Sequence, residues 1–157
     1  MVPVVNGTRW EGMGSLEDPR DKLGSHADVV AAPVARLDDR IVGDQRISFI
    51  KCDVEGHEDR VFDGATHALG GLPVLLVEIE YRHRESGPDR LIDRLSALGL
   101  TGWAVFGDGL RPVEEFDLER DQLRYLDSSE AEQMPAGYVH DFLFTPPQFD
   151  VSALRAP

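Results

Sequence analysis

Acidic residues follow two apolar segments of the sequence, at the point where each segment ends. Asp53 and Glu55 close the first segment, and Glu78 and Glu80 close the second. Carboxylates in such positions can act as general bases or as oxygen ligands for a hard divalent cation. The alternative interpretation is that they are hydrated carboxylates which accept hydrogen bonds from nearby backbone amides and from Lys51.

Lys51 lies inside the first apolar segment, where a lysine is costly unless its ammonium group is paired or reaches the edge of the sheet. We therefore expect a carboxylate partner, and Glu78 on the neighbouring segment is the obvious candidate. Such an ion pair can be purely structural as readily as it can be catalytic.

The histidines and the single cysteine carry weaker signals. His57 begins a predicted helix and is expected at the surface, while Cys52 is expected to be a small buried apolar side chain. His83 comes shortly after the second acidic pair, but the sequence assigns no role to it or to His140.

The two segments that end in acids belong to an alternation of strands and helices. The patterning predicts strands over residues 47–53, 74–80, 101–106 and 138–144, and helices over residues 57–69 and 88–98. This order is typical of an α/β fold with right-handed crossovers, in which ligands bind beyond the carboxyl ends of the strands. The apolar character of 47–53 further predicts a strand that is covered on both faces.

The remaining segments are less strongly patterned. Val2–Val5 and residues 8–10 are predicted to form a hairpin around Asn6-Gly7. We expect an irregular loop at residues 11–26, followed by a short strand at residues 28–34 and a helical turn at residues 37–40. We expect an acidic surface excursion at residues 112–133. Because no repeat or linker divides the sequence, we expect one domain over residues 1–157.

Composition excludes several classes of function. The 29 acidic and 16 basic side chains give a net charge of −13, which argues against binding nucleic acid or an anionic membrane. One cysteine excludes an internal disulfide framework and a cysteine-rich metal site. Since no apolar run is long enough for a membrane span or a leader, we expect a cytoplasmic protein.

One stretch carries a more specific signal. Residues 47–65 read ISFIKCDVEGHEDRVFDGA and closely resemble the hallmark segment of the FkbM family of S-adenosylmethionine-dependent methyltransferases, K-x-D-V-E-G-x-E followed by a helix with G-A. The similarity continues at residues 2–16, 37–39, 73–80 and 141–144. It therefore covers most of the chain, and residues 47–80 are its most diagnostic part.

The resemblance implies a fold, a reaction and a set of site residues. The fold would be a partial Rossmann-like class I methyltransferase sheet, with parallel strands, crossover helices and a final antiparallel strand. The reaction would transfer a methyl group from S-adenosylmethionine to a hydroxyl of a small molecule, such as a sugar or a secondary metabolite. Asp53, Glu55 and Glu78 would serve as the base and orient the substrate, and Lys51 would hold the carboxylates in place.

The sequence also departs from the family pattern. Family members begin with a strand and a glycine-containing turn of the D-V-G-A-N type that holds the methionine moiety, followed by a strand whose final acid binds the ribose. This sequence has neither, so we expect an N-terminally truncated domain and assign no cofactor-binding residue and no metal ligand. Two alternatives follow. The chain could be a non-catalytic interaction module whose sheet is completed by a second copy or another chain, or a metal hydrolase that relies on the acids alone.

Overall fold

The computed structural model describes the backbone of residues 2–5, 8–9, 27–28, 33–83, 87–126, 135 and 137–154, and it divides into two units, residues 1–35 and 36–157. In the first unit, β1 (Val2–Val5) pairs antiparallel with both β2 (Thr8–Arg9) and β3 (Ala27–Asp28). The predicted hairpin is confirmed. The predicted loop at 11–26 lies outside the described residues, as do positions 29–32 of the predicted strand 28–34.

The second unit is built on a five-stranded mixed sheet with the order β4-β5-β8-β6-β7. Its strands are β4 (Phe49–Cys52), β5 (Val74–Glu78), β6 (Thr101–Phe106), β7 (Gly109–Pro112) and β8 (Asp141–Thr145). Only β4 and β5 pair in parallel, and the other pairs are antiparallel. The predicted final antiparallel strand is confirmed in β8, which lies between β5 and β6 and keeps these two strands from pairing with each other.

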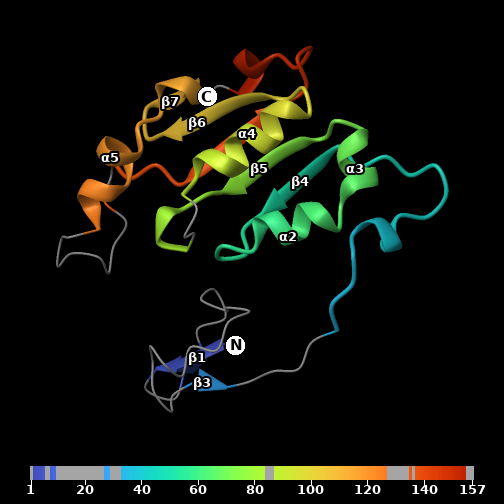
Figure 1. Cartoon of the computed structure of the whole chain (residues 1–157), viewed down its shortest axis with the longest axis horizontal. Coiled ribbons are helices and arrows are strands. Elements are labelled where there is room, and N and C mark those ends of the chain that lie inside the picture. Colours follow the sequence, from blue (N-terminus) through green and yellow to red (C-terminus); the bar gives the residue numbers. More distant parts are fainter. Residues whose placement is uncertain are drawn as a thin grey trace. The chain divides into compact units, whose positions relative to one another are not determined.

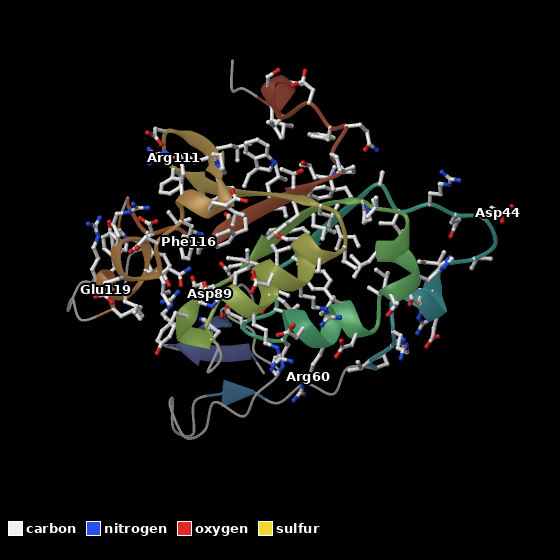
Figure 2. All side chains as sticks on the ribbon, turned by 45° about the horizontal axis from the view of Figure 1, so that its top comes forward. Asp44, Arg60, Asp89, Arg111, Phe116 and Glu119 are labelled. Atoms are coloured by element: carbon white, nitrogen blue, oxygen red, sulfur yellow. The ribbon has the colours of Figure 1, made fainter. Side chains whose placement is uncertain are left out.

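Helices pack on one face of this sheet (Figure 1). They are α2 (Glu58–Asp63), α3 (Thr66–Gly70) and α4 (Asp89–Ala97). The core between helices and sheet contains fully buried aromatic and aliphatic side chains, among them Phe62, Leu75, Val77, Leu91, Leu95, Phe142 and Phe144. Charged side chains such as Arg60 and Glu119 point outward (Figure 2).

The predicted helix over residues 57–69 is two helices, so that prediction is wrong in its continuity. The break falls at Gly64-Ala65, where a Cβ on Gly64 would lie 3.4 Å from Cα of Arg36. The carboxylate of Asp38, in the short 3₁₀ turn η2 (Asp38–Arg40), accepts the amides of His67 and Ala68 at 2.9 and 3.1 Å. These two bonds cap α3 and start a new helix at that point.

The β4 strand is not covered on both faces, which corrects the prediction made from its apolar sequence. It lies at the edge of the described sheet, and Phe49 keeps 53% of its surface exposed while Cys52 keeps 3%. Lys51 is exposed on the same face as Phe49. Its ammonium group therefore reaches water without crossing the core.

The sequence predicts a surface excursion over residues 112–133, and the structure corrects this for residues 113–126, whereas residues 127–133 lie outside the part of the chain that it describes. The described segment folds into η4 (Val113–Glu115), α5 (Leu118–Asp121) and η5 (Leu123–Tyr125). Three of its side chains, Val113, Asp121 and Gln122, are buried. Two further short turns, η3 (Tyr81–His83) and η6 (Val151–Leu154), follow β5 and β8.

Among the described residues, no helix combines the length and the apolar composition that a bilayer span requires.

Candidate active site

The carboxyl ends of β4 and β5 lie side by side because the two strands are parallel neighbours, with Lys51 opposite Leu76 and Cys52 opposite Val77. Asp53, Glu55 and Glu78 each place one carboxylate oxygen within 4.8 Å of the others. The structure therefore brings together the three acids that the sequence singled out. Exposed acids are often this close without a cation, so the spacing alone does not indicate a metal site.

Asp53 and Glu78 form a carboxyl pair, in which the two groups are joined by a side-chain hydrogen bond. The pKa of Glu78 is raised to about 8. Partial burial is the largest cause, and the hydrogen bond with Asp53 and the negative charge of Asp53 also contribute. The hydrogen bond from Lys51 lowers the pKa of Asp53. Near neutral pH the carboxyl pair thus holds one proton, on Glu78, and one negative charge, on Asp53.

Lys51 contacts Asp53, not Glu78 as predicted. Its Nζ donates to Oδ2 of Asp53 at 2.8 Å, and both side chains are exposed. The prediction is wrong because the register places Lys51 opposite Leu76, so its ammonium group reaches along its own chain to the residue two positions on. The charges of Glu78 and Asp141 act on Lys51 only at longer range. An exposed pair of this kind contributes little stability, on the order of 0–1 kcal/mol.

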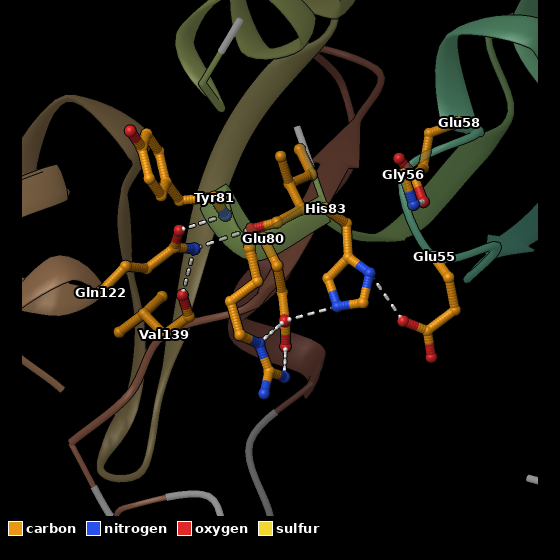
Figure 3. A network of polar contacts seen from close by, with 10 residues as sticks. Glu55, Gly56, Glu58, Glu80, Tyr81, His83, Gln122 and Val139 are labelled. Carbon is orange, nitrogen blue, oxygen red and sulfur yellow. Dashed lines mark hydrogen bonds and ion pairs between the residues drawn. The ribbon is translucent and has the colours of Figure 1, made fainter. Parts of the chain in front are cut away.

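A second group of charged side chains lies beside the carboxyl pair, and we call Glu55, Glu80, Arg82 and His83 the His83 cluster (Figure 3). Nδ1 of His83 lies 2.9 Å from Oε2 of Glu55, and Nε2 lies 3.3 Å from Oε2 of Glu80. Arg82 donates to both oxygens of Glu80, at 2.5 and 2.9 Å. Because each ring nitrogen of His83 faces a carboxylate, the imidazole is held in a fixed orientation.

The charges of the His83 cluster set its protonation. Burial by itself would raise the pKa of Glu80, whose side chain is 2% exposed, but the hydrogen bonds from His83 and Arg82 outweigh burial and lower the pKa to about 2. The hydrogen bond to Glu80, with the charge of Glu55, raises the pKa of His83. Glu55 and Glu80 therefore favour the protonated form of His83, in which both ring nitrogens can donate to an acid.

The turn after β4 is shaped by Glu55 and Gly56, which adopt positive φ values of 52° and 92°. Only glycine fits at position 56, because a Cβ there would lie 2.2 Å from the backbone oxygen of His83. The amide of Gly56 donates to Oε1 of the buried Glu58 at 3.0 Å. A left-handed glutamate is a strained residue, and strain of this kind is concentrated at functional sites.

Other residues considered from sequence have mixed outcomes. Cys52 is buried, as predicted, whereas His57 is partly buried and so is not the surface residue expected. His140 stacks on Tyr138 with ring centroids 5.9 Å apart, and its Nε2 lies 3.7 Å from Oδ2 of Asp141. The roles of Arg82, His83 and Gln122 were missed. The only sequence signal was the placement of two cations directly after the acid that ends a strand.

A comparison with protein families identifies the family of the chain. The model of the methyltransferase FkbM domain matches residues 7–100, which is more than half of the chain. The chain belongs to the FkbM methyltransferase family. No curated protein and no solved structure matches it. The FkbM match contains β4, β5, the turn of Glu55 and the His83 cluster, and it ends before β6.

FkbM methyltransferases as a family imply S-adenosylmethionine, and the described residues can be tested for a fit to its methionine end. The space beside Gly56 is filled by the His83 carbonyl, and the Gly56 amide already donates to Glu58. The surrounding acids Asp53, Glu55 and Glu78 would repel the carboxylate of the methionine group, although they would attract its ammonium and sulfonium groups. The turn at Gly56 therefore provides no site for the methionine carboxylate, and the acids remain available to an acceptor molecule.

Proposed function

We propose that the protein is an S-adenosylmethionine-dependent methyltransferase of the FkbM type that methylates a hydroxyl oxygen of a small molecule, such as a sugar or a secondary metabolite. The observation that carries this proposal is the carboxyl pair. It joins an ionised acid and a protonated acid at the carboxyl ends of two parallel strands, inside the segment that the family match covers. A hydroxyl acceptor needs such a group, because it must lose its proton as the new bond to carbon forms.

In this proposal Asp53 is the proton acceptor. The hydrogen bond from Lys51 keeps Asp53 ionised near neutral pH, because it lowers the pKa of that carboxyl group. Glu78 stays protonated and can donate a hydrogen bond to the acceptor oxygen or to Asp53, which fixes the geometry of the attacking hydroxyl. When the acceptor proton moves to Asp53, the carboxyl pair becomes neutral and holds two protons.

Glu55 orients the acceptor in this proposal. His83 holds the carboxylate of Glu55 at 2.9 Å, within 4.8 Å of the carboxyl pair. One of its oxygens can therefore accept a hydrogen bond from a second hydroxyl on a polyhydroxylated molecule. A molecule with two hydroxyls close together would contact Asp53 with one and Glu55 with the other.

We also propose that the sheet is the C-terminal part of a Rossmann-like methyltransferase sheet, in a cytoplasmic protein. In support, β4, β5 and β6 run in one direction, and β8 runs against them between β5 and β6. The partners would be the hydroxylated acceptor and, at the open edge of β4, a second copy or another chain that completes the sheet. We propose neither nucleic acid nor membrane as a partner, since the net charge is −13.

The open edge also favours a second candidate function, a non-catalytic interaction module. Phe49 is 53% exposed on β4, and the amide of Gly56 at the site already donates to Glu58. An apolar edge strand of this kind invites pairing with another strand. The metal-hydrolase alternative receives no such support, because Lys51 and the proton on Glu78 already offset the charge that a cation would neutralise.

One experiment separates these functions. The purified protein is titrated with S-adenosylmethionine by calorimetry and incubated with a panel of polyhydroxylated acceptors, and release of S-adenosylhomocysteine is measured. We expect binding and acceptor-dependent release, with release lost and binding retained in Asp53→Asn. If the cofactor does not bind and sedimentation shows self-association, the interaction module is the correct function. A melting shift with Mg²⁺ that Asp53→Asn abolishes would revive the hydrolase.

A further inference from the structure

Gln122 is a fully buried polar residue in the bend between α5 and η5, and its exposed fraction is 0%. Its Nε2 donates to the backbone oxygens of Ile79 and Val139, at 2.7 Å each. Its Oε1 accepts the backbone amide of Tyr81 at 2.8 Å. The side chain thus uses both amide hydrogens and its oxygen on backbone groups from two other segments (Figure 3).

These bonds occur where β5 and β8 separate. The two strands are paired as far as Glu78 opposite Asp141, and the amide of Ile79 still donates to the oxygen of His140 at 2.8 Å. Beyond that point the Ile79 and Val139 oxygens are bridged by Gln122. The primary amide replaces the backbone hydrogen bonds that the ladder would otherwise supply, so no buried oxygen is left unsatisfied there.

Few side chains could replace Gln122 in bonding these three backbone groups. The site requires two donors and one acceptor on one planar group, which is the inventory of an amide. A carboxylate in its place would face two carbonyl oxygens with no hydrogen to donate, and an aliphatic side chain would leave three backbone groups without a partner. Asparagine has the same group on a shorter stem and would not span the same distance.

The excursion that carries Gln122 is itself fixed in place. The oxygen of Asp121 accepts the amide of Val139 at 3.0 Å. The buried carboxylate of Asp121 accepts the amide of Asp117 at 2.9 Å and two hydrogen bonds from Arg120. Gln122 is therefore presented to β5 from an anchored element and not from a loose loop.

We propose that Gln122 is a positioning residue of the candidate active site, which acts by fixing the backbone at Ile79 and Tyr81 on either side of Glu80. The bonds flank Glu80 directly, and Ile79 follows Glu78, so both acids and the start of η3 depend on them. Gln122 touches neither Asp53 nor the acceptor. The inference rests on the proposed function only in treating Glu78 as catalytic, and it extends the site to an element outside the family match.

The test compares Gln122→Met with the matched control Gln45→Met, in which an exposed glutamine loses its single bond to the amide of Val42. In the Gln122 variant we expect exchange of the Tyr81 amide to accelerate at least about tenfold, since a lost hydrogen bond of roughly 1.4 kcal/mol is a tenfold change. We also expect the imidazole nitrogen signals of His83 to shift. The control should change neither. Unchanged Tyr81 exchange and His83 signals in folded Gln122→Met would overturn the proposal.

Gln122→Glu keeps the proposal testable if Gln122→Met fails to fold. A protonated glutamic acid can still donate one hydrogen bond, whereas its carboxylate can donate none. The carboxylate is repelled by the oxygens of Ile79 and Val139, so we expect it to withdraw from the Tyr81 amide as well. Relative to the wild type at each pH, Tyr81 exchange in this variant should therefore be slower at pH 5 than at pH 8, and a ratio that is independent of pH would overturn the proposal. Both readouts are spectroscopic, so wild-type protein without methyl transfer would refute the proposed function and leave this inference standing.

Discussion

Glu78 and Glu80 lie two residues apart at the end of the same strand, yet they are in opposite protonation states. The pKa of Glu78 is raised to about 8, and that of Glu80 is lowered to about 2. Burial favours the protonated form of both. The difference arises from the neighbours, because Glu78 faces the carboxylate of Asp53 whereas Glu80 faces Arg82 and His83. Burial is the largest cause of the raised pKa of Glu78, but the neighbouring groups decide why the two acids differ.

This contrast separates a chemical role from a supporting one. The carboxyl pair can gain or release a proton near neutral pH, which suits it to proton transfer. In the His83 cluster, Glu80 stays ionised over that range, and His83 holds Glu55 and the turn after β4 in place. The following predictions test this division, from the largest expected effect to the smallest.

Asp53→Asn should have the largest effect, and it should fall on activity alone. Removal of a general base typically costs about 10² to 10⁴ in rate, while the exposed bond from Lys51 contributes little to stability. We expect kcat for methyl transfer to fall in that range with the melting temperature almost unchanged. Asp63→Asn is the matched control, because Asp63 is also an exposed aspartate with a cationic partner, Arg94. Equal loss of activity in both variants would contradict a specific role for Asp53.

Glu80→Gln should instead reduce stability. The change leaves Arg82 and His83 without their buried anion, which we expect to cost about 2 kcal/mol at pH 7, less than a fully buried pair because Arg82 is 37% exposed. A carboxyl group with a lowered folded pKa stabilises the fold above its unfolded value near 4.5 and loses that effect as the pH falls toward 2. The difference in urea unfolding between variant and wild type should therefore shrink below pH 4.5. A difference in unfolding free energy that does not change with pH would show that the lost stability does not come from the ionised carboxylate of Glu80.

Glu78→Gln should change stability by a smaller amount, and this change should have the opposite pH dependence. The folded protein holds the Glu78 proton up to a pKa of about 8, whereas the unfolded chain releases it near 4.5, so the wild type loses stability as pH rises between these values. The neutral variant avoids that loss, and we expect it to be more stable than the wild type at pH 9, by about 1 kcal/mol. Thermal melts at pH 5, 7 and 9 measure this. A variant that is less stable than the wild type at every pH would show that the pKa of Glu78 is not raised in the folded protein.

Lys51→Met should have the smallest effect on stability, below about 1 kcal/mol, because the ion pair with Asp53 is exposed. Lys51 holds the pKa of Asp53 below its ordinary value, so the loss of Lys51 should raise that pKa. We therefore expect the acidic limb of the methyl-transfer pH profile to move to higher pH. If the limb stays in place, Lys51 does not control the ionisation of Asp53.

The adjacency of the acidic strand ends was predictable from local sequence. Two apolar strands with a helix between them must lie in parallel when they are neighbours, and this brings Asp53 and Glu78 to one edge. The break between α2 and α3 was not predictable, since it depends on the close approach of Gly64 to Arg36. The apolar period of that segment continues through the break and gives no sign of it.

The partners of the charged residues were less predictable than their positions. Lys51 was expected to contact Glu78, but which carboxylate it contacts depends on the register of β4 against β5, and a strand's own residues do not specify that register. Gln122 lies in a segment with weak patterning, and its three bonds join residues 17 to 43 positions away. Contacts of this range are set by the packing of the whole sheet.

The most direct test of this account is a carboxyl ¹³C NMR titration of the protein labelled at glutamate, with Glu78→Gln and Glu80→Gln used to assign the two signals. We predict that Glu78 titrates near pH 8 and that Glu80 stays ionised down to about pH 2. If both groups titrate together between about pH 4 and 5, as unperturbed glutamates do, the carboxyl pair and the His83 cluster do not differ in the way described.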